Sequence, residues 1–497
     1  MQRPKIFKKN DGFQRLSPHD AGWIIGIVFL SLSPGAGATS VIRGPYLQQL
    51  TPTSVVIVWR TDSASDSLVH YGTDPGNLSG TVEKDPAVTQ HEVQIADLWP
   101  ETRYYYSIGA SDKILAGGNS DYFFTTAPPV GKRAAVRIWV LGDSGTGACP
   151  ACWSGKDDAP AVRDAMLNEM SKSGDIHLWL MLGDNAYMGG TDEEYEASVF
   201  EMYPTFLRNY PLWPTLGNHD GYLADSEDQT GAYFEAFVLP TLGEAGGVAS
   251  GTEDYYSFDY ANIHFICLNS MAGPLTKDSM LAWLGADLAE TQQDWLIAYW
   301  HHPPYSKGTI DSDSETTSTW IRQEVLPILE SGGVDLVLNG HSHVYERSFL
   351  VNGYYGASST LSAGMVRSTG IESDITNSEN ALFQKAGGPN QGTVYVVAGT
   401  SGVVIAENHD SHPVMAVTSF ALGSLILDVN GDRLDMMFLR ETGGVDDSFT
   451  ILKSGESKLP AAAGCALKRP KRGVDLTREG FCRGGPCRPR GRESTAQ

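Results

Sequence analysis

Apolar residues follow two different patterns along the chain, and the pattern changes near residue 130. Before that point, short β-branched and aromatic runs such as 54–60 are separated by turn residues at the spacing typical of a β-sandwich. After it, longer apolar runs such as 134–141 and 177–182 alternate with polar loops and helical patterns. The sequence therefore predicts an all-β domain over 39–128, followed by an α/β or α+β domain over 133–440.

Three further elements can be placed within the second domain. A helix is expected over 160–170, where Val162, Met166 and Met170 form one apolar stripe. A second helix is expected over 317–330. Near the end of the domain, two apolar runs flank Asn430 and Gly431, which predicts a β-hairpin.

The two ends of the chain differ in composition from the domains. Residues 1–38 combine basic residues, a short apolar run over 21–32 and small residues ending at Ala38, which is typical of a cleaved secretory signal. That run is shorter than the ~20 residues that span a bilayer. We expect a secreted, periplasmic or extracellular protein; an uncleaved anchor or a misassigned start codon is the alternative. Residues 455–497 are basic and rich in Pro and Gly, so a flexible tail is expected, with polybasic docking as the alternative.

The charge balance limits the partners of the protein. With 36 basic and 59 acidic residues, the chain carries a formal net charge of −23. Such a surface repels nucleic-acid backbones and anionic membranes, so neither is expected as a general partner and a small-molecule substrate is favoured. A phosphate site in this chain must carry its own local positive charge. The sequence leaves the oligomeric state open.

The six cysteines are compatible with an oxidising compartment without requiring one. Cys149 and Cys152 form a C-x-x-C segment, for which a loop-closing disulfide is favoured over redox chemistry because no second such motif accompanies it. Cys482 and Cys487 could pair locally in the tail. Cys267 lies in an apolar run and is expected to be a buried thiol.

Five loops that follow strand-like runs carry most of the candidate chemistry. Ligands of α/β sheets collect outside the carboxyl ends of the strands, so such loops can converge on one point. The donors in these loops are Asp143, Asp184, Tyr187, Asn218, His219, His301, His302, His341 and His343. They exceed the four ligands that a single zinc ion takes. They suit two ions bridged by a carboxylate, in which one ion presents hydroxide as nucleophile and both hold phosphate oxygens. Oxygen and nitrogen donors without thiolate favour iron, manganese or zinc.

The order and the residue identities of these motifs resemble those of a known family. Asp143, G-D-x-x-Y at 183–187, G-N-H-D at 217–220, H-x-P at 301–303 and G-H-x-H at 340–343 are similar to the motif set of calcineurin-like metallophosphoesterases. Tyr187 and the V-Y-E-R segment after His343 look specifically like purple acid phosphatases. The L-x-P-x-T-x-Y segment over 98–104 resembles fibronectin type III domains. The resemblance implies a four-layer catalytic domain of two stacked sheets flanked by helices, after a fibronectin-like sandwich.

The resemblance also implies roles for the individual residues. Asp184 would bridge two ions, and His219 would stabilise the phosphoryl oxygens or the leaving group. A phenolate ligand implies Fe(III) in the first site, with Fe, Zn or Mn in the second. The first-site ligands would be Asp143, Asp184, Tyr187 and His343; the second-site ligands would be Asp184, Asn218, His301 and His341. The H-x-P spacing selects His301 over its neighbour His302 as the ligand.

Departures from the family pattern affect proton transfer. Asp220 stands where the family usually carries Glu, and the Cys149–Cys152 loop is an addition. Ile310 stands where the family has a substrate-side histidine, nine residues after His301. General-acid work would then pass to His219, to His302 or to metal-bound water. The later loop histidines His409 and His412 are expected to be exposed, with lining of the pocket as the alternative.

These features favour an acid phosphatase-like hydrolase of phosphate monoesters. Because monoester dianions need more positive charge than diesters, the isoleucine at position 310 gives some weight to a phosphodiesterase acting on cyclic nucleotides or other diesters. A non-catalytic binding protein is the third possibility, and the complete ligand set argues against it.

Overall fold

The computed structural model describes residues 39–145, 158–370, 381–405 and 411–454. The expected signal segment 1–38, the basic tail 455–497 and the Cys149–Cys152 loop lie outside the described residues, as does His409. Within the described parts, none of the helices combines the length and the apolar character needed to cross a membrane.

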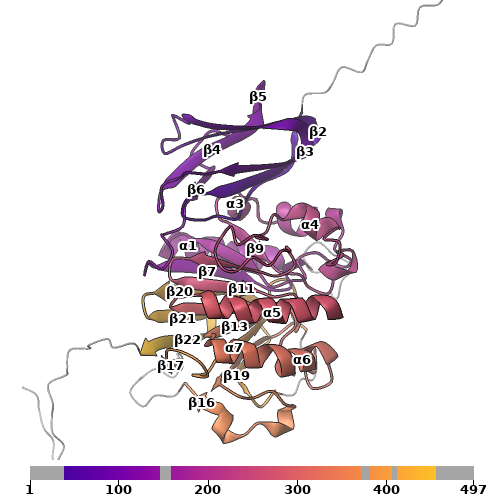
Figure 1. Cartoon of the computed structure of the whole chain (residues 1–497), viewed down its shortest axis with the longest axis vertical. Helices are drawn as coiled ribbons and strands as arrows, with labels where there is room; N and C mark the ends of the chain where they lie inside the picture. Colours follow the sequence, from indigo (N-terminus) through magenta and orange to yellow (C-terminus); the bar gives the residue numbers. More distant parts are fainter. Residues whose placement is uncertain (1–38, 146–157, 371–380, 406–410, 455–497) are drawn as a thin grey trace, which may run out of the picture. The chain divides into compact units, whose positions relative to one another are not determined.

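The N-terminal domain is a β-sandwich of antiparallel strands, as expected (Figure 1). The long strand β2 pairs with β1, β3 and β4, so one strand connects most of the domain. Tyr104 provides the corner hydrogen bond that the L-x-P-x-T-x-Y pattern predicts, because its hydroxyl accepts from the Trp99 N–H at 2.9 Å. The strands are β1 (Val41–Gln48), β2 (Val55–Gly72), β3 (Gly80–Ile95), β4 (Arg103–Ala110), β5 (Lys113–Gly117) and β6 (Phe123–Thr125).

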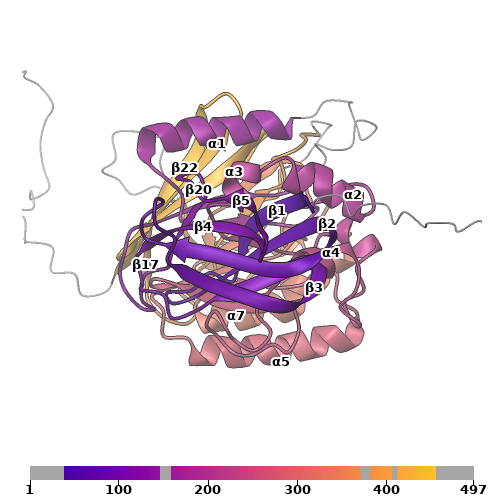
Figure 2. The same cartoon turned by 90° about the horizontal axis from the view of Figure 1, so that it is seen from above.

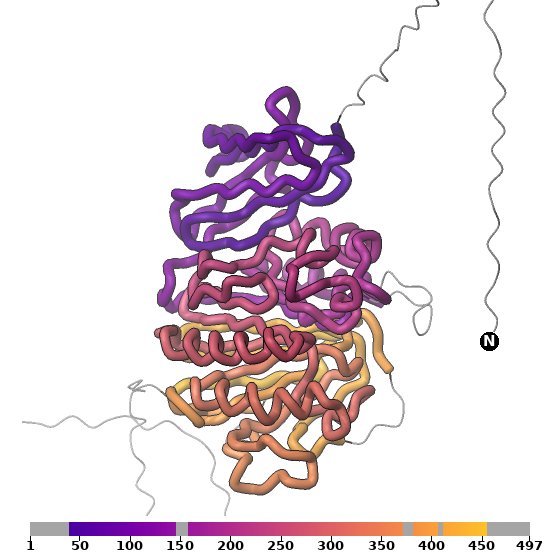
Figure 3. The backbone as a smooth tube through the Cα atoms, turned by 45° about the vertical axis from the view of Figure 1, so that its right-hand side comes forward, coloured from indigo at the N-terminus to yellow at the C-terminus, as the bar shows by residue number. Residues whose placement is uncertain are grey.

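The second domain contains two seven-stranded sheets. The first has the order β17-β22-β21-β20-β7-β8-β9, so strands from the end of the chain lie beside strands from the start of the domain (Figure 3). Of its inner strands, β8 is fully buried and β7 is buried except at Arg137, as the continuous apolar pattern predicts. The strands are β7 (Val136–Leu141), β8 (Leu178–Met181), β9 (Leu212–Pro214), β17 (Ala381–Ala386), β20 (Gly423–Asn430), β21 (Arg433–Arg440) and β22 (Val445–Ser454).

The second sheet has the order β10-β11-β12-β13-β18-β14-β19. A separate two-stranded sheet pairs β15 with β16. The strands are β10 (Tyr256–Tyr260), β11 (Ile263–Cys267), β12 (Trp295–Tyr299), β13 (Leu336–Asn339), β14 (Tyr345–Ser348), β15 (Leu350–Val351), β16 (Val366–Ser368), β18 (Val394–Ala398) and β19 (Met415–Ser419).

Helices cover the outer faces of the two sheets, which confirms the four-layer arrangement (Figure 2). In that view α1 lies at one edge and α5 with α7 at the other. The helices are α1 (Ala159–Ser173), α2 (Asp192–Tyr195), α3 (Pro204–Leu207), α4 (Ala232–Ala236), α5 (Pro274–Glu290), α6 (Thr316–Trp320) and α7 (Leu326–Gly332). Shorter helical segments are η2 (Glu196–Phe200), η3 (Asp220–Tyr222), η4 (Ile321–Val325), η5 (Ser358–Thr360) and η6 (Ala363–Met365).

Several expectations can be compared with these elements. The stripe residues Val162 and Met166 are buried on α1, and the hairpin around Asn430 and Gly431 joins β20 to β21. Cys267 is a free, buried thiol, and burial raises its pKa to about 12. The domain extends beyond residue 440, because β22 continues the sheet by pairing with β21.

Parallel strands fix the position of the site. Strands β7, β8 and β9 are mutually parallel, and so are β11, β12 and β13. Their carboxyl ends therefore open at one edge of each sheet, where the motif-bearing loops begin.

Candidate metal centre

The backbone at three of the strand ends adopts an unusual conformation. Asp143, Asp184 and His341 all have left-handed backbone angles, with φ of 56°, 53° and 69°. Non-glycine residues rarely adopt this conformation, and it clusters at functional sites. The adjoining loops also pack closely: a Cβ on Gly217 would lie 2.1 Å from the Asp184 amide nitrogen. The loops are thus held in a conformation that turns these three side chains toward one another.

The first group of donors surrounds the Tyr187 hydroxyl. That oxygen lies 2.8 Å from Asp184 Oδ2, 3.2 Å from Asp143 Oδ1 and 3.3 Å from His343 Nε2. All four side chains are buried. Burial and the two carboxylates hold the pKa of Tyr187 well above its usual value, so a bound cation is required to favour the phenolate. These are the four residues expected at the first metal.

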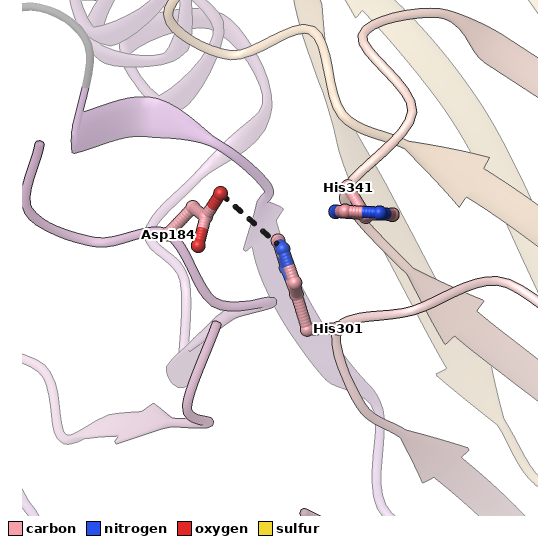
Figure 4. Close-up of side chains that lie close together, drawn as sticks. All are labelled: Asp184, His301 and His341. Atoms are coloured by element: carbon pink, nitrogen blue, oxygen red, sulfur yellow. Dashed lines mark ion pairs between the residues drawn. The ribbon is translucent and has the colours of Figure 1, made fainter. Parts of the chain in front are cut away.

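The second group shares Asp184 with the first. Ligand atoms of Asp184, His301 and His341 all lie within 4.8 Å of one another (Figure 4). His301 Nε2 is 3.3 Å from Asp184 Oδ2 and 3.0 Å from Asn218 Oδ1. These are the four residues expected at the second metal, and Asp184 is the side chain common to both groups.

Hydrogen bonds orient His301 toward this group. Its Nδ1 donates to the carbonyl of Leu182 at 2.9 Å, which leaves Nε2 facing Asp184. Burial disfavours the charged imidazolium, but Asp184 outweighs it and raises the pKa of His301 to about 10. In return, and against the effect of burial, His301 holds the pKa of Asp184 below its usual range.

Asp220 supports the site by hydrogen bonding to two of the ligand-bearing loops. Its carboxylate accepts hydrogen bonds from the backbone of Asn185, Ala186 and Gly217 and from the Tyr195 hydroxyl. Burial and the nearby Asp184 raise the pKa of Asp220 to about 6. The shorter side chain, which replaces the family's usual Glu, therefore joins the loop after β8 to the loop after β9.

His219 lies at the accessible side of the centre. Its Nδ1 donates to the Met188 carbonyl at 2.8 Å, and its Nε2 is 3.9 Å from Asp184 Oδ2. The backbone N–H of His219 donates to Asp184 Oδ1. Its ring packs on that of Tyr187, with centroids 4.2 Å apart. The contact with Met188 therefore leaves Nε2 of His219 on the side of Asp184.

His302 is buried and packs on His341, with ring centroids 4.2 Å apart. The Ser270 hydroxyl lies 2.8 Å from His302 Nδ1 and fixes the ring. Burial and the neighbouring His341 and His301 hold the pKa of His302 well below its usual value. The side chain thus lies in the site, on the His341 side.

Glu315 belongs to the site although the motif pattern does not include it. Its Oε1 accepts a hydrogen bond from His341 Nε2 at 2.9 Å, which leaves Nδ1 as the ring nitrogen able to bind an ion. Although burial opposes it, this contact lowers the pKa of Glu315. Ligand atoms of His302, Glu315 and His341 lie within 4.8 Å of one another. No family motif marks Glu315; its position directly before α6 was the available signal.

The loop that carries Ile310 packs against the centre. Thr309 Oγ1 accepts from the His343 N–H at 3.0 Å, and Ile310 is partly buried. Asp311, a possible alternative proton donor, pairs with Lys307 instead. Lys307 also pairs with Asp313 at 3.1 Å.

The expectation of exposure is wrong for His412. Its side chain is buried against the rings of Tyr305 and Tyr354, and burial lowers its pKa to about 4. Aromatic packing holds this end of the loop inside the domain. The imidazole forms no part of either donor group described above.

The donor set fits two cations. Asp143 and Asp184 are buried carboxylates, and in the described residues their ion pairs are with histidines only. Buried carboxylates require compensating positive charge, and here neither lysine nor arginine supplies it within the described part of the chain. The oxygen and nitrogen donors suit iron, zinc or manganese.

Comparison with known proteins agrees with this geometry. Residues 136–345 match the calcineurin-like phosphoesterase family, and residues 45–126 match the purple acid phosphatase N-terminal domain. The chain therefore carries a calcineurin-like phosphoesterase domain preceded by a purple acid phosphatase N-terminal domain. The two matches cover the sandwich and the strands that carry all nine candidate residues.

Similar proteins share this arrangement to different extents. Purple acid phosphatase 15 of Arabidopsis thaliana is 27% identical over 371 residues, covering 68% of this chain and 63% of the relative. This chain thus spans less than two thirds of that relative's length. The structure of a purple acid phosphatase from yellow lupin (Lupinus luteus) seeds matches with a TM-score of 0.59 and 17% identity, covering 82% of this chain and 74% of the other. That of PhoD gives a TM-score of 0.56 at 13% identity, covering 82% and 89%. These structural likenesses concern the fold.

Proposed function

We propose that this metallophosphoesterase hydrolyses phosphate monoesters at a dinuclear metal centre. The observation that carries the proposal is the shared carboxylate: Asp184 belongs both to the group around Tyr187 and to the group with His301 and His341. A bridging carboxylate is what a two-ion phosphoesterase site requires. Asp143 and His343 would complete the first site, and Asn218 the second.

The chain's own residues would bind and orient the substrate. When bound, the two ions would supply positive charge for the phosphate oxygens and activate water. His219, held by Met188, would direct Nε2 at a phosphoryl oxygen or at the leaving group. His302, held by Ser270, would contact the substrate from the side of His341. Positioned groups of this kind typically contribute ~10²–10⁴-fold to the rate.

The first site would hold Fe(III), with Fe, Zn or Mn in the second. Tyr187 supports this assignment because its hydroxyl lies within 3.3 Å of three other candidate ligands. A phenolate oxygen is a hard donor that suits a highly charged ion, and binding to such an ion favours loss of the phenol proton. Iron in this site would give a visible charge-transfer band that depends on Tyr187.

A phosphodiesterase activity is the second candidate. The observation that favours it is the scarcity of positive side chains: Lys307, on the loop beside His343, is neutralised by Asp311 and Asp313. Diesters carry one negative charge fewer than monoester dianions and need less compensation.

Rates on an aryl phosphate and its bis-aryl ester would distinguish these activities. We expect the metal-loaded protein to hydrolyse phenyl phosphate faster than diphenyl phosphate under identical conditions. The reverse order would favour the diesterase. Failure to hydrolyse either ester with two metals bound would contradict the phosphoesterase proposal as a whole.

We also propose that the protein is exported. The pattern of residues 1–38 supports this, as an n-region and an apolar core ending in Ala38. N-terminal sequencing of the secreted protein would test it: a mature chain beginning at Thr39 is expected, and retention of residues 1–38 in the cytosol would contradict it.

A further inference from the structure

A cleft of about 580 Å³ opens beside the candidate metal centre. Two segments line it, one running from Leu216 to Glu227 and the other from Met271 to Thr276 at the start of α5. A volume of this size accommodates a small organic molecule. None of the nine candidate site residues lines it, so the cleft is a separate feature of the molecule.

Both walls of the cleft continue directly into the site. On the first, Tyr222 packs edge-on against the His219 ring with centroids 5.5 Å apart, and the same His219 ring packs on Tyr187. On the second, Met271 follows Ser270, whose hydroxyl contacts His302. A phosphate ester held at the metals would therefore have its organic part next to this cleft.

The lining of the cleft is apolar and acidic. Tyr222, Leu223 and Leu275 line it and are 67%, 56% and 78% exposed, which is unusual for large apolar side chains gathered in one place. Its charged lining residues are Asp225 and Glu227, and no lysine, arginine or histidine is among the lining residues that the structure describes. Such a lining favours an uncharged apolar group and repels an anionic one.

We propose that this cleft binds the leaving group of the substrate, and that the leaving group is an uncharged aromatic or other apolar moiety. The substrate class is then a monoester with a single phosphate and an apolar alcohol or phenol. Sugar polyphosphates and nucleoside di- or triphosphates, whose remainder after loss of one phosphate is anionic, fit poorly. This inference rests on the proposed phosphoesterase activity, and it adds a specificity that the metal centre alone does not provide.

A matched pair of substrates tests the proposal. Phenyl phosphate and 2-naphthyl phosphate differ by one fused ring, and their leaving groups are similar in acidity. Burying that ring in the cleft removes ~40 Å² more apolar surface from water, so we expect kcat/KM to be about fivefold higher for the naphthyl ester. A 6-sulfonate on the naphthyl ring keeps the fused ring and adds a negative charge, and it should abolish the advantage. Equal kcat/KM for phenyl and naphthyl esters would overturn the proposal.

Substitutions in the cleft test whether the preference for the naphthyl ester arises there. Leu275→Asp and Leu223→Asp place a charge on each wall and should reduce the naphthyl-to-phenyl ratio to about one. Leu242→Asp is the control, since Leu242 is 76% exposed and lies outside the cleft; its ratio should equal that of the unmodified protein. Circular dichroism and metal content establish that the variants are folded. A ratio that survives both cleft variants would show that the apolar group binds elsewhere.

Affinity measurements with non-hydrolysable compounds distinguish the cleft assignment from the proposed phosphoesterase activity. 2-Naphthylmethylphosphonate and benzylphosphonate differ by the same fused ring and resist hydrolysis, and calorimetry on the metal-loaded protein measures their affinities. We expect the naphthyl compound to bind about fivefold more tightly, and Leu275→Asp to remove the difference. If no ester is hydrolysed but this difference in affinity is found, the proposed activity is contradicted and the cleft assignment is supported. If esters are hydrolysed and the difference is absent, the cleft assignment fails alone.

Discussion

At the residue scale, the backbone of the candidate ligands shows how the site is prearranged. The left-handed angles of Asp143, Asp184 and His341 are unfavourable for residues with a Cβ, and the surrounding packing must maintain them. Gly183 and Gly217 permit that packing, because a side chain on either would collide with the neighbouring loop. The positions of the donors are therefore set by the fold, and bound ions would add to an arrangement that already exists.

Glu315 should control the affinity of the second metal through His341. Glu315→Gln keeps a hydrogen-bond acceptor and should weaken binding of the second ion mildly, whereas Glu315→Ala should weaken it by about 10–100-fold. Competition with a chelator, followed by elemental analysis, measures this without reference to turnover. Glu324→Gln is the control, an exposed glutamate on η4. Unchanged metal retention in Glu315→Ala would show that the carboxylate does not orient the ligand.

Ile310 provides a test of proton transfer. Its neighbour Thr309 contacts His343, so a histidine at position 310 would stand close to the centre. Ile310→His should raise hydrolysis of alkyl monoesters, whose leaving groups need a proton, by more than it raises hydrolysis of aryl esters. The alkyl-to-aryl rate ratio is the measurement. If the ratio stays constant, another group already supplies the proton, and His302→Ala should then lower it.

Motifs identified most of the site residues from sequence, because each motif residue directly follows a buried strand whose apolar pattern is unmistakable. Glu315 and Ser270 could not be found in this way. Both lie in loops without a motif, and their contacts with His341 and His302 depend on how distant loops fold against each other. The burial of His412 was missed for the same reason, since tertiary contacts with Tyr305 and Tyr354 decide it.

At the scale of the elements, a buried ionic cluster joins two strands to a helix. His264 on β11 lies between Asp259 on β10 and Asp287 on α5, with both N···O distances 2.8 Å. Asp287 also accepts from the Ser257 hydroxyl and the Val248 N–H, which secures the preceding loop. This cluster fixes α5, whose first turn lines the cleft beside the metal centre.

The cluster predicts how stability depends on pH. Burial disfavours the imidazolium, but the two aspartates outweigh it and raise the pKa of His264 to about 9. Because the folded pKa exceeds the unfolded value of ~6.5, the stabilisation is fully present below pH ~6.5 and is lost as the pH rises through about 9. Its full size is about 3 kcal/mol, at 1.36 kcal/mol for each unit of the pKa difference.

Urea denaturation of the metal-saturated protein between pH 6 and pH 10 measures this effect. His264→Gln should be less stable at pH 6 and should lose most of the decline in stability toward alkaline pH. His70→Gln removes a histidine at the sandwich surface and should keep the decline. An unaltered pH profile in His264→Gln would refute the role of this cluster.

Elements with a continuous apolar pattern were predictable and others were not. Buried strands such as β7 and β12, and the helix α1, follow from local sequence. The strand β19 is only partly buried and β22 begins with the exposed residues Val445 and Asp446, so their sequences carry weak patterns. Their place in the sheets depends on pairing with β14 and β21. A local sequence pattern does not show which strands pair.

At the scale of the whole molecule, the N-terminal sandwich supports the loop that carries Tyr187. Arg43 on β1 pairs with Glu196 at 2.6 Å and with Asp192 at 2.9 Å, and its guanidinium lies over the Phe200 ring. Between Asp192 and Glu196, Glu194 accepts hydrogen bonds from the backbone of Met188 and Gly189. The sandwich thus holds the segment that positions the first metal site, and this dependence was not visible in the sequence.

Loss of Arg43 should therefore destabilise the protein. Arg43→Met removes two charged hydrogen bonds from a buried guanidinium and should lower the free energy of unfolding by about 1.5–3 kcal/mol. Arg103→Met is the matched control, because Arg103 is half exposed and pairs with Asp175 at 3.4 Å; its effect should stay below ~1 kcal/mol. Chemical denaturation at fixed metal concentration measures both. Equal effects of the two substitutions would contradict this view of the interface.

The metal content of the purified protein tests the central claim most directly. The sharing of Asp184 between two donor groups predicts two transition-metal ions per chain, one of them iron, with a visible band that Tyr187→Phe abolishes. Asp184→Ala should lose both ions together, while His219→Ala, which removes no ligand, should keep them. A preparation that hydrolyses phosphate esters with one metal ion or none per chain, or an Asp184→Ala variant that retains both ions, would contradict the account.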